Sequence, residues 1–380
     1  MDRARAVREP AIATTTLERS VQVGAAPVVE DLSATIVSGR VTPAEARRGQ
    51  VDAIEAERLG FRRIFLAERY NVKEAGAYLS GIAARTTRIE VGTGVLAMGS
   101  RSPLMTAALA ATMHALYGPR FVLGLGRSDP ALVKVKQPAT YEALVDYATI
   151  VRRLLAGERV TYSGPAGDYA DLALTDLPED ATPPIWYGME GGPRASRVVA
   201  NPVFDGVYLS DFMTVECVKR SIDWMRAECE RLGRDPSTLR ICLPIITACE
   251  LDDQETLALT KARLVSYVSY PAIGALVERN GWDVRRLDQI RDHVQIRSLA
   301  GANVDHSFRR RDMLEPAKLV PDEWIRASCA VGTADECVRV LQSFKDVGVD
   351  EFATYGSSPV QNASLIAAWR AWAASSSTQP

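Results

Sequence analysis

Short apolar runs alternate with amphipathic helical runs along most of this chain. The clearest stretch is 88–129, where two β-branched runs, Arg88–Val95 and Arg120–Leu125, flank one helical run, Pro103–Tyr117. Each β-branched run ends in a glycine motif, and the helical run begins with proline. This order of strand, glycine-rich exit, helix and strand is typical of parallel βαβ units. In such folds, functional residues collect at the carboxyl ends of the strands.

The same alternation can be counted over the whole chain. The predicted strands are Val21–Ala25, Phe61–Ala67, Arg88–Val95, Arg120–Leu125, Pro184–Gly188, Asp205–Leu209, Arg240–Thr247 and Glu351–Tyr355. The predicted helices are Thr42–Leu59, Lys73–Thr86, Pro103–Tyr117, Tyr141–Leu155, Pro193–Val199, Thr214–Leu232, Gln254–Val268, Ala334–Val347 and Val360–Trp372. Strands separated by helices, with no obvious linker, predict a (β/α)8 TIM barrel as a single domain over 21–375. A doubly wound open sheet is the alternative, which the strand count disfavours.

Two longer segments interrupt the alternation. The first, 157–183, is rich in Gly, Pro and Asp, and the second, 270–323, has predicted short helices around Trp282–Ile296. Long connections in compact domains are usually functional, so we expect both insertions at the catalytic rim. Residues 1–20 are charged and have no apolar core of the kind that a secretion signal needs. They are predicted to be a disordered or loosely packed leader.

Composition excludes several classes of function. The net charge of −2 and the pI of about 6.1 give no reason to expect nucleic acid or an acidic membrane surface as a partner. No run of apolar residues is long enough for a transmembrane helix. The six cysteines form no CxxC pair, and with three histidines in the chain no metal site is predicted. We expect reduced, mostly buried thiols in a cytoplasmic protein.

Two glycine motifs follow the strands of the clearest stretch. The first, GTGVLA at 92–97, matches the dinucleotide pattern GxGxxG/A by letter. That fold requires the helix to begin inside the motif and an acidic residue about 20 positions later. Here residues 98–103 delay the helix, and no acid lies between Ala97 and Val122. The second motif, GLG at 124–126, lacks the third small residue, so both glycine motifs are also compatible with simple tight turns.

A third glycine motif, GMEGGPRA at 188–195, predicts an anion-binding site. It follows the short strand candidate at 185–187 and opens a helix with a proline in the first turn. Free backbone N–H groups and the positive helix end attract anions there. Arg194 lies in that first turn, where the helix dipole disfavours a cation, so an anion nearby would explain it. A solvated arginine after an ordinary turn is the alternative.

Charged residues also follow the strand candidate Phe61–Ala67. Glu68, Arg69, Tyr70 and Asn71 stand where side chains would point into a barrel mouth, although a salt-bridged loop would have the same sequence. His114 lies among apolar residues of a helical run, which is typical of packing. No GxSxG nucleophile elbow is present.

Taken together, these motifs resemble the bacterial-luciferase-like family of flavin- or deazaflavin-dependent oxidoreductases. The resemblance covers residues 51–356. The ordered matches are AERLGF at 56–61, Glu68, ARTTRI at 84–89, GTGV at 92–95, LYGPR at 116–120, GLG at 124–126, GGP at 191–193, FDGV at 204–207 and GTADE at 332–336. KEA at 73–75, TMH at 112–114 and GLGR at 124–127 are similar to the branch that uses coenzyme F420, a deazaflavin.

The resemblance implies a (β/α)8 barrel with inserted segments and a cofactor in its mouth. It also implies a bulge after the third strand, often with a non-prolyl cis peptide, behind the deazaflavin ring. The implied cofactor-binding residues are Gly94 and Val95 at the bulge; Gly126, Arg127 and Ser128 beside the ring or ribityl chain; and Gly188, Gly191, Gly192, Pro193, Arg194 and Ala195 around the phosphate. Arg127 and Arg194 suit an anionic tail.

The implied reaction is hydride transfer between the deazaflavin C5 and a small organic substrate, for which the protein supplies orientation and a proton donor or acceptor. Many relatives have a histidine where Arg69 stands, and the small residue expected after GLG is replaced by Ser128. The proton role therefore stays open between Glu68, which we rank first, Asp129 and Tyr70, with Arg69 fixing substrate charge.

Three other functions remain open. An FMN-dependent monooxygenase of the same barrel would need oxygen and a separate reductase, and a cofactor-binding barrel without turnover would explain the departures at Arg69 and Ser128. A nicotinamide-dependent enzyme is the last.

Trp369 and Trp372 are spaced for packing within one helix or for a dimer contact, and dimers are common in the family. We therefore also predict a homodimer.

Overall fold

The computed structural model describes residues 25–36, 43–68, 73–127, 140–268, 274–298 and 310–376. The predicted leader and the predicted site residues Arg69, Ser128 and Asp129 lie outside these residues, as does Tyr70, so the inferences about them stay predictions.

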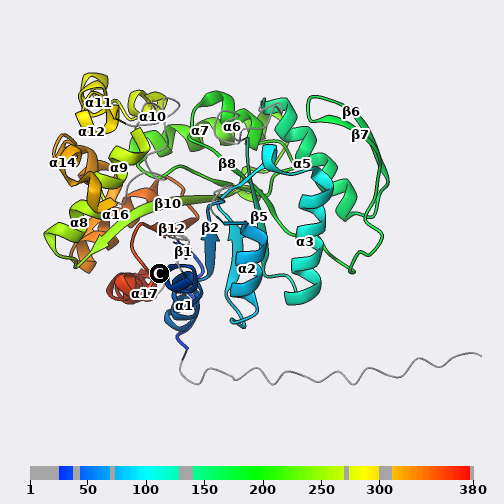
Figure 1. The fold of residues 1–380 in the computed structure, drawn as a ribbon, viewed down its shortest axis with the longest axis horizontal. Coiled ribbons are helices and arrows are strands. Elements are labelled where there is room, and N and C mark those ends of the chain that lie inside the picture. The colour runs from blue at the N-terminus through cyan, green and yellow to red at the C-terminus, as the bar shows by residue number, and fades with distance from the viewer. Residues whose placement is uncertain are drawn as a thin grey trace, which may run out of the picture.

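A closed barrel of parallel strands forms the centre of the molecule (Figure 1). Its strands, in the order in which they pair, are β1 (Leu32–Ile36), β2 (Arg63–Leu66), β3 (Glu90–Thr93), β5 (Phe121–Gly126), β8 (Ile185–Gly188), β9 (Gly206–Tyr208), β10 (Arg240–Cys249) and β12 (Glu351–Tyr355). The register Leu32↔Phe352 joins the first strand to the last and closes the ring. The predicted (β/α)8 barrel is confirmed, and the open sheet is excluded.

Helices surround this barrel, and most of them match the predicted ranges. The helices that follow the barrel strands are α1 (Pro43–Leu59), α2 (Ala75–Ala83), α3 (Pro103–Tyr117), α5 (Tyr141–Leu155), α6 (Pro193–Val199), α7 (Val215–Arg231), α8 (Asp253–Leu259), α9 (Lys261–Val268), α16 (Ala334–Asp346) and α17 (Ala363–Ser376). Local caps fix their ends. The Ser102 hydroxyl accepts the Met105 N–H at the start of α3, and Gly118 ends this helix with a φ of 71°.

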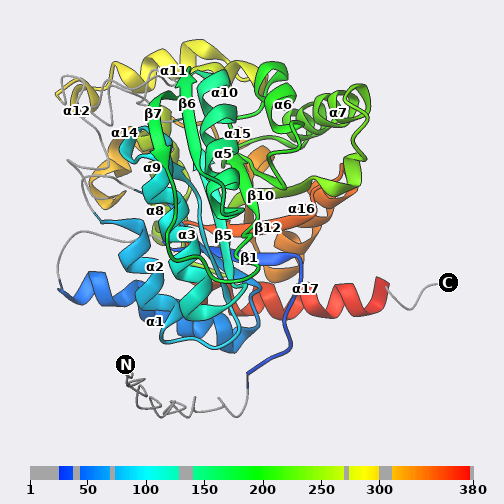
Figure 2. The same cartoon turned by 90° about the vertical axis from the view of Figure 1, so that its right-hand side faces the viewer.

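Additional elements occupy the two predicted insertions. Within 157–183, β6 (Val160–Gly164) and β7 (Gly167–Leu172) form an antiparallel hairpin. The second insertion, 270–323, holds the short helices α10 (Gly274–Arg279), α11 (Val284–Arg291), α12 (Val294–Arg297), α14 (Leu314–Ala317) and α15 (Asp322–Ser328). The last of these, α15, extends beyond the predicted end of the insertion. Figure 2 shows α10 to α12 at one end of the molecule and α17 across the opposite end.

The prediction of the first strand is wrong. Residues 21–24 of the predicted strand lie outside the described residues, and Ala25 is not in a strand. The first strand of the barrel is Leu32–Ile36 instead. This strand was missed because two of its five residues are polar, although all five are buried. The Ser33 hydroxyl donates to Glu351, and the Thr35 hydroxyl pairs with the Tyr208 hydroxyl at 2.8 Å. A polar side chain that finds its partner inside a barrel breaks the apolar pattern from which a strand is predicted.

Other differences are smaller. The strand β11 (Cys329–Gly332), which pairs with the end of β10, was missed, as were β6, β7 and β4 (Leu96–Ala97), which pairs with β5. The helix predicted over 254–268 is broken into α8 and α9 at Thr260. No helix among the described residues is long and apolar enough to cross a bilayer. All six cysteines are buried and free, as predicted.

The barrel interior is built in layers from the amino end of the strands upward. The lowest layer is an ion network in which the buried Glu351 carboxylate accepts from Ser33 at 2.6 Å and Arg240 at 2.7 Å and lies 3.1 Å from Arg63. The Arg63 guanidinium also pairs with Glu90. Every charge in this layer therefore has an opposite charge beside it, as buried ions require.

An aromatic layer lies above this network. Its buried members are Phe65, Val122, Trp186, Tyr208, Cys242 and Ala353, against which Val95 packs. The Phe65 ring is 4.7 Å from the Tyr208 ring and 5.7 Å from the Trp186 ring, measured between centroids. The Arg63 guanidinium lies 4.7 Å from the Trp186 ring centroid and joins the two layers. This packed floor holds the side chains that face the barrel mouth.

Candidate active site

A backbone bulge follows β3 at the carboxyl end of the barrel. The Gly94–Val95 peptide bond is cis, as the family resemblance implies. The Gly94 N–H donates to the Leu66 carbonyl at 2.8 Å, and the Glu68 N–H donates to the Val95 carbonyl at 3.2 Å. These bonds tie the bulge to the end of β2 and hold the Val95 side chain over the barrel interior.

Two of the predicted cofactor-binding glycines make room for this valine. A Cβ atom on Gly188 would lie 2.5 Å from Val95 Cγ1, and one on Gly126 would lie 2.6 Å from Val95 Cγ2. Real Cβ atoms do not approach other heavy atoms so closely, so any larger residue at either position would displace Val95. The glycines at the ends of β5 and β8 thus shape the bulge from the opposite side.

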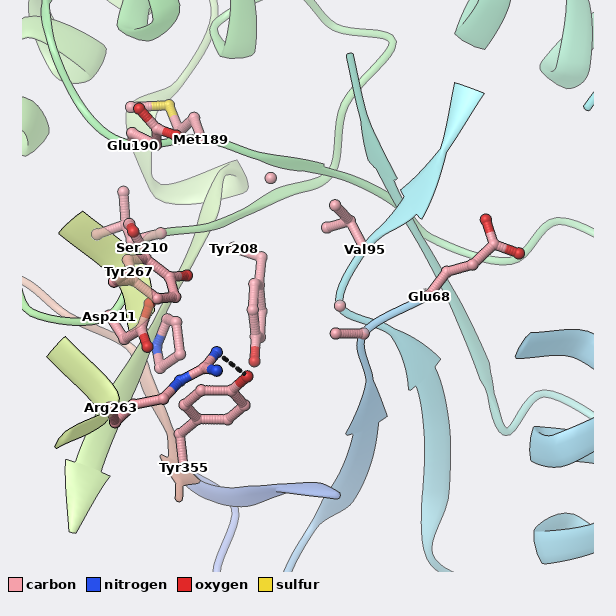
Figure 3. A pocket seen from close by; sticks show the side chains of 15 residues that line it. Glu68, Val95, Met189, Glu190, Tyr208, Ser210, Asp211, Arg263, Tyr267 and Tyr355 are labelled. Carbon is pink, nitrogen blue, oxygen red and sulfur yellow. Dashed lines mark hydrogen bonds between the residues drawn. The ribbon is translucent and has the colours of Figure 1, made fainter. Parts of the chain in front are cut away.

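A cavity of about 320 Å³ opens beside the bulge (Figure 3). Its wall combines the ends of several strands with two side chains of α9. The lining residues are Ala67, Glu68, Gly94, Val95, Gly188, Met189, Glu190, Tyr208, Leu209, Ser210, Asp211, Pro244, Arg263, Tyr267 and Tyr355. Figure 3 shows Val95 on one side, and Asp211, Arg263 and Tyr267 on the other. Such a cavity can hold a flat ring against the bulge with polar groups facing it.

The polar wall is a set of phenols around one buried arginine. Arg263 Nη2 donates to the Tyr355 hydroxyl at 2.7 Å, and its guanidinium lies 5.0 Å from the Tyr267 ring and 5.1 Å from the Tyr355 ring. Tyr267 is hydrogen-bonded to the buried Asp211. Burial first, and the nearby Asp211 charge second, raise the pKa of Tyr267 well above its usual 10. This phenol therefore keeps its proton at neutral pH.

A second polar region, the arginine rim, consists of Arg127, Arg194 and Arg279 around the turn at 190–193. The Arg127 and Arg194 guanidinium groups lie 4.0 Å and 5.0 Å from the centroid of one ring, that of Tyr141. Arg279 Nη2 is 3.6 Å from the Glu190 carboxylate. Burial raises the pKa of Glu190, whereas Arg279 and Arg127 lower it. Glu142 also lies near Arg194 and Arg127. Among the described residues the rim therefore combines three arginines with two acids, Glu190 and Glu142, and keeps a small excess of positive charge.

The turn itself requires glycine. Gly191 and Gly192 have φ values of 77° and 96°, which L-residues with a side chain rarely adopt. Pro193 opens α6 in the first turn, and Ser196 closes that turn through the Gly192 carbonyl. Gly192 lies next to Arg279, because a Cβ atom on Gly192 would be 3.6 Å from Arg279 Cδ. The predicted anion-binding turn is therefore surrounded by the arginine rim.

A family model for luciferase-like monooxygenases matches residues 33–351, which span the barrel from its first strand to its last. The chain belongs to the luciferase-like monooxygenase family. A curated relative, 5,10-methylenetetrahydromethanopterin reductase of Methanolobus tindarius, is 24% identical over 304 residues, which cover 78% of this chain and 86% of the relative.

Two solved structures show the same fold. The coenzyme F420-dependent tetrahydromethanopterin reductase from Methanopyrus kandleri has a TM-score of 0.72 at 19% identity, covering 90% of this chain and 98% of that one. An F420-dependent secondary alcohol dehydrogenase in complex with an F420–acetone adduct has a TM-score of 0.67 at 17% identity, with coverages of 90% and 99%.

Within this luciferase-like barrel, Glu68 points away from the polar wall (Figure 3). Its carboxylate accepts hydrogen bonds from the Ala97 N–H, the Ser100 hydroxyl and Arg101 Nη2, at 3.2, 3.2 and 2.9 Å. The side chain is 3% exposed. A carboxylate with this many donors, and so little contact with solvent, holds the loop after the bulge. The geometry gives the proton role that we ranked first for Glu68 no support.

The other predicted residues have different surroundings. Gly191, Gly192, Pro193 and Arg194 lie with Arg127 at the rim, although Arg127 and Arg194 are far apart in sequence. Gly188 instead faces Val95 at the bulge. Ala195 is the exception in this group, because its side chain is buried in the outer core rather than at the rim. Its predicted contact with a phosphate could come only from its backbone.

Residue-by-residue sequence reasoning missed the polar wall. Asp211 and Tyr355 stand at or just after strand ends, so the rule that selected Glu68 would have selected them as well. Arg263 and Tyr267 lie in α9 at a spacing of four residues, and nothing in their local sequence distinguishes them from other helical residues. Arg279, from the second insertion, carries no local signal either.

Proposed function

We propose that this chain is a coenzyme F420-dependent oxidoreductase, which transfers a hydride between the deazaflavin C5 and a small organic substrate. The observation that carries the proposal is one continuous site: a cavity against the Gly94–Val95 bulge, next to a rim of three arginines. A flat redox ring with an acidic tail needs both parts. Relatives named as F420-dependent dehydrogenases support the choice of cofactor.

The residues present fit such a group. The cationic rim suits phosphate and carboxylate groups, because guanidinium donates several hydrogen bonds in one plane. Nε of Arg279 is buried without a hydrogen-bond partner among the described residues, and a bound anion would satisfy it. Arg127, Arg194 and the Gly191–Gly192 turn would hold the acidic tail, and Val95 would support the ring. When bound, the deazaflavin supplies the hydride chemistry, and the protein supplies position and proton transfer.

The proposal is tested by titrating the protein with F420 and, separately, with FMN. We expect F420 to bind at micromolar concentrations or below, read from its fluorescence, and FMN to bind at least tenfold more weakly. Tighter binding of FMN, together with oxygen uptake when reduced FMN is supplied, would overturn the proposal in favour of a flavin monooxygenase. Binding of F420 without reaction across a panel of alcohols, ketones and enones would indicate a barrel without turnover.

Two further properties belong to the same proposal. We propose that the enzyme acts in the cytoplasm, which the six free, buried thiols support, and that it forms a homodimer. Trp369 is fully buried within its own chain, 4.4 Å from the Trp372 ring and hydrogen-bonded to Asp31, so it is not available for a dimer contact. Sedimentation that shows only a 41.4 kDa species would contradict the dimer.

A further inference from the structure

The polar wall of the cavity has a feature that the proposed hydride transfer leaves unexplained: a buried acid paired with a phenol. Asp211 follows β9 and is 2% exposed, and Tyr267 reaches it from α9. Both residues line the cavity on the side opposite Val95 (Figure 3). If a flat ring lay against Val95, a substrate above it would face this pair. Burying a carboxylate costs free energy, so its position in a cavity wall calls for a role.

We propose that Asp211 and Tyr267 exchange a proton with the substrate oxygen of a small, uncharged alcohol or ketone. The inference rests on the proposed function, since a deazaflavin must take or give the hydride. Tyr267 donates its single hydroxyl hydrogen to Asp211, so the pair presents acceptor oxygens to the cavity. The hydroxyl group of an alcohol can donate to such oxygens, and after the proton has passed to the pair, the pair can donate to the oxygen of a ketone.

The wall holds this pair in place. Arg263 lies four residues before Tyr267 on α9, and its guanidinium packs against the Tyr267 ring while donating to Tyr355. Phe212, next to Asp211, packs edge-on against Tyr267 at 5.8 Å and is fully buried. The two members of the pair are thus fixed from both sides. Proton transfer gains from groups that do not have to move before they react.

The other acids near the cavity are placed differently. Glu68 is held by three donors and points away, and Glu190 is 43% exposed and pairs with Arg279 at the rim. The groups around Asp211 that titrate or carry charge are Tyr267 and Arg263 of α9, Tyr208 of β9, Tyr355 of β12, Glu190 after β8 and Cys329 of β11. Among these described groups, only Asp211 is a fully buried acid.

The substrate class follows from the size and the lining of the cavity. A space of about 320 Å³ beside the bulge fits the edge of the ring together with a small substrate. Met189, Leu209 and Pro244 supply apolar wall around the polar pair. With a deazaflavin bound as the oxidant, oxidation of the alcohol would break the carbinol C–H bond, and the hydride would be lost to that oxidant. The O–H bond breaks as well, its proton passes to Asp211 directly or through Tyr267, and a C=O bond forms.

The experiment uses two variants, Asp211→Asn and Tyr267→Phe, each with a matched control away from the cavity. Asp350→Asn changes an acid that accepts the Ile241 N–H, and Tyr147→Phe changes a buried phenol paired with Thr106. Single-turnover reduction of F420 by propan-2-ol, and oxidation of reduced F420 by acetone, read hydride transfer. We expect at least a hundredfold loss in Asp211→Asn and about tenfold in Tyr267→Phe, with F420 affinity within twofold and less than threefold change in the controls.

A second measurement tests whether Asp211 and Tyr267 bind an alcohol when no reaction can take place. 2-Methylpropan-2-ol has no carbinol hydrogen, so it can bind but cannot be oxidised, and saturation-transfer NMR detects its binding to wild-type protein. We expect the signal to fall at least threefold in both variants. In wild-type protein, the rate of alcohol oxidation should rise with pH, and Asp211→Asn should abolish this rise. If Asp211 had only a structural role, the rise of the rate with pH would remain in the variant.

The outcomes separate the two proposals. If F420 does not bind wild-type protein, the proposed function fails. If F420 binds and is reduced by another class of donor, but neither propan-2-ol nor any other small alcohol reacts, the substrate class is overturned. If small alcohols react and both variants keep wild-type single-turnover rates, the pair is overturned while the proposed function stands.

Discussion

Two polar clusters lie inside the same barrel, one at each end, and they are built in opposite ways. The Glu351 cluster at the amino ends of the strands fills its space with matched ions: one fully buried carboxylate, two arginines and a serine within 3.1 Å of it. The Asp211 cluster, which is the polar wall of Asp211, Arg263, Tyr267 and Tyr355, lies at the carboxyl ends and borders a cavity of about 320 Å³. The charges of the first cluster pair with one another, and the second cluster faces a space that another molecule can enter.

This difference shows how a barrel separates stability from chemistry. Buried charges that pair only with each other can hold strands in register, but they offer nothing to a ligand. Polar groups that border a cavity do less for the fold, because part of their surroundings is the cavity itself. In barrels of this kind the amino end serves stability and the carboxyl end serves catalysis. Substitutions at either end of the barrel test this contrast between stability and catalysis.

The largest effect is expected at the amino end, from Glu351→Ala. Removing this carboxylate leaves Arg63 buried with one carboxylate partner fewer, and breaking a buried pair typically costs about 3–5 kcal/mol of unfolding free energy. Urea denaturation measures that loss. Asp223→Ala, in an exposed pair with Lys219, should cost less than about 1 kcal/mol. An effect of Glu351→Ala no larger than that of Asp223→Ala would contradict the contrast between the clusters.

The next effect is expected at the rim. Arg127→Ala and Arg194→Ala should each weaken F420 binding about tenfold to hundredfold, because a hydrogen bond to a charged group contributes about 1.5–3 kcal/mol. Fluorescence titration at two salt concentrations measures the loss of F420 affinity and how far salt screens the attraction between each arginine and the acidic tail. Arg153→Ala is the control. Arg153 lies on the same helix as Tyr141 but at its other end, away from the rim, and pairs with Glu158. Equal affinity in all three variants would place the acidic tail elsewhere.

A smaller effect on chemistry is expected from Glu68→Gln. An amide can still accept from Ala97 and Ser100 but loses the charge that pairs with Arg101. We expect a loss of about 1–3 kcal/mol in unfolding free energy and less than about a tenfold change in hydride transfer. A hundredfold loss of hydride transfer at unchanged stability would restore Glu68 as the proton-transferring residue.

The smallest effect concerns Glu190 and pH. Desolvation raises its pKa above the ordinary 4.5, against the pull of Arg279. The contribution of this group to stability is therefore present at low pH and is lost as pH rises through the folded-state pKa. Over the same range a negative charge develops at the rim, so F420 affinity should fall by about twofold to threefold. Titrations of Glu190→Gln across pH should remove this step, and a step that persists in this variant would assign it to another group.

The sequence predicts most of the barrel because its signals are local. The bounds of α3, α5 and β12 match their predicted ranges, since a capping serine or threonine and a glycine or a charged boundary mark the ends of such elements. Leu32–Ile36 was missed for the opposite reason: its serine and threonine depend on Glu351 and Tyr208, which are remote in sequence. A polar residue inside a barrel is explained only by the partner that the fold brings to it.

The site divides along the same line. The turn at 191–193 is a short motif that the sequence itself indicates, and the bulge at Gly94–Val95 was implied by the family resemblance. The polar wall combines Asp211, Arg263, Tyr267 and Tyr355 from three separate parts of the chain, none of which forms a motif alone. For Glu68, the residue type and the strand end were predicted, but the direction of its side chain was not. Backbone motifs are therefore easier to predict than assembled walls.

The pairing of Leu32 with Phe352 has a consequence for how the protein is made. During synthesis the ribosome releases β1 some three hundred residues before β12, and in that interval the edge of β1 has no strand to cover one side. The ring cannot close until nearly the whole chain has emerged, so a nascent chain that stalls early would expose an unpaired sheet edge and be prone to aggregate. Chaperone demand should accordingly be highest late in translation.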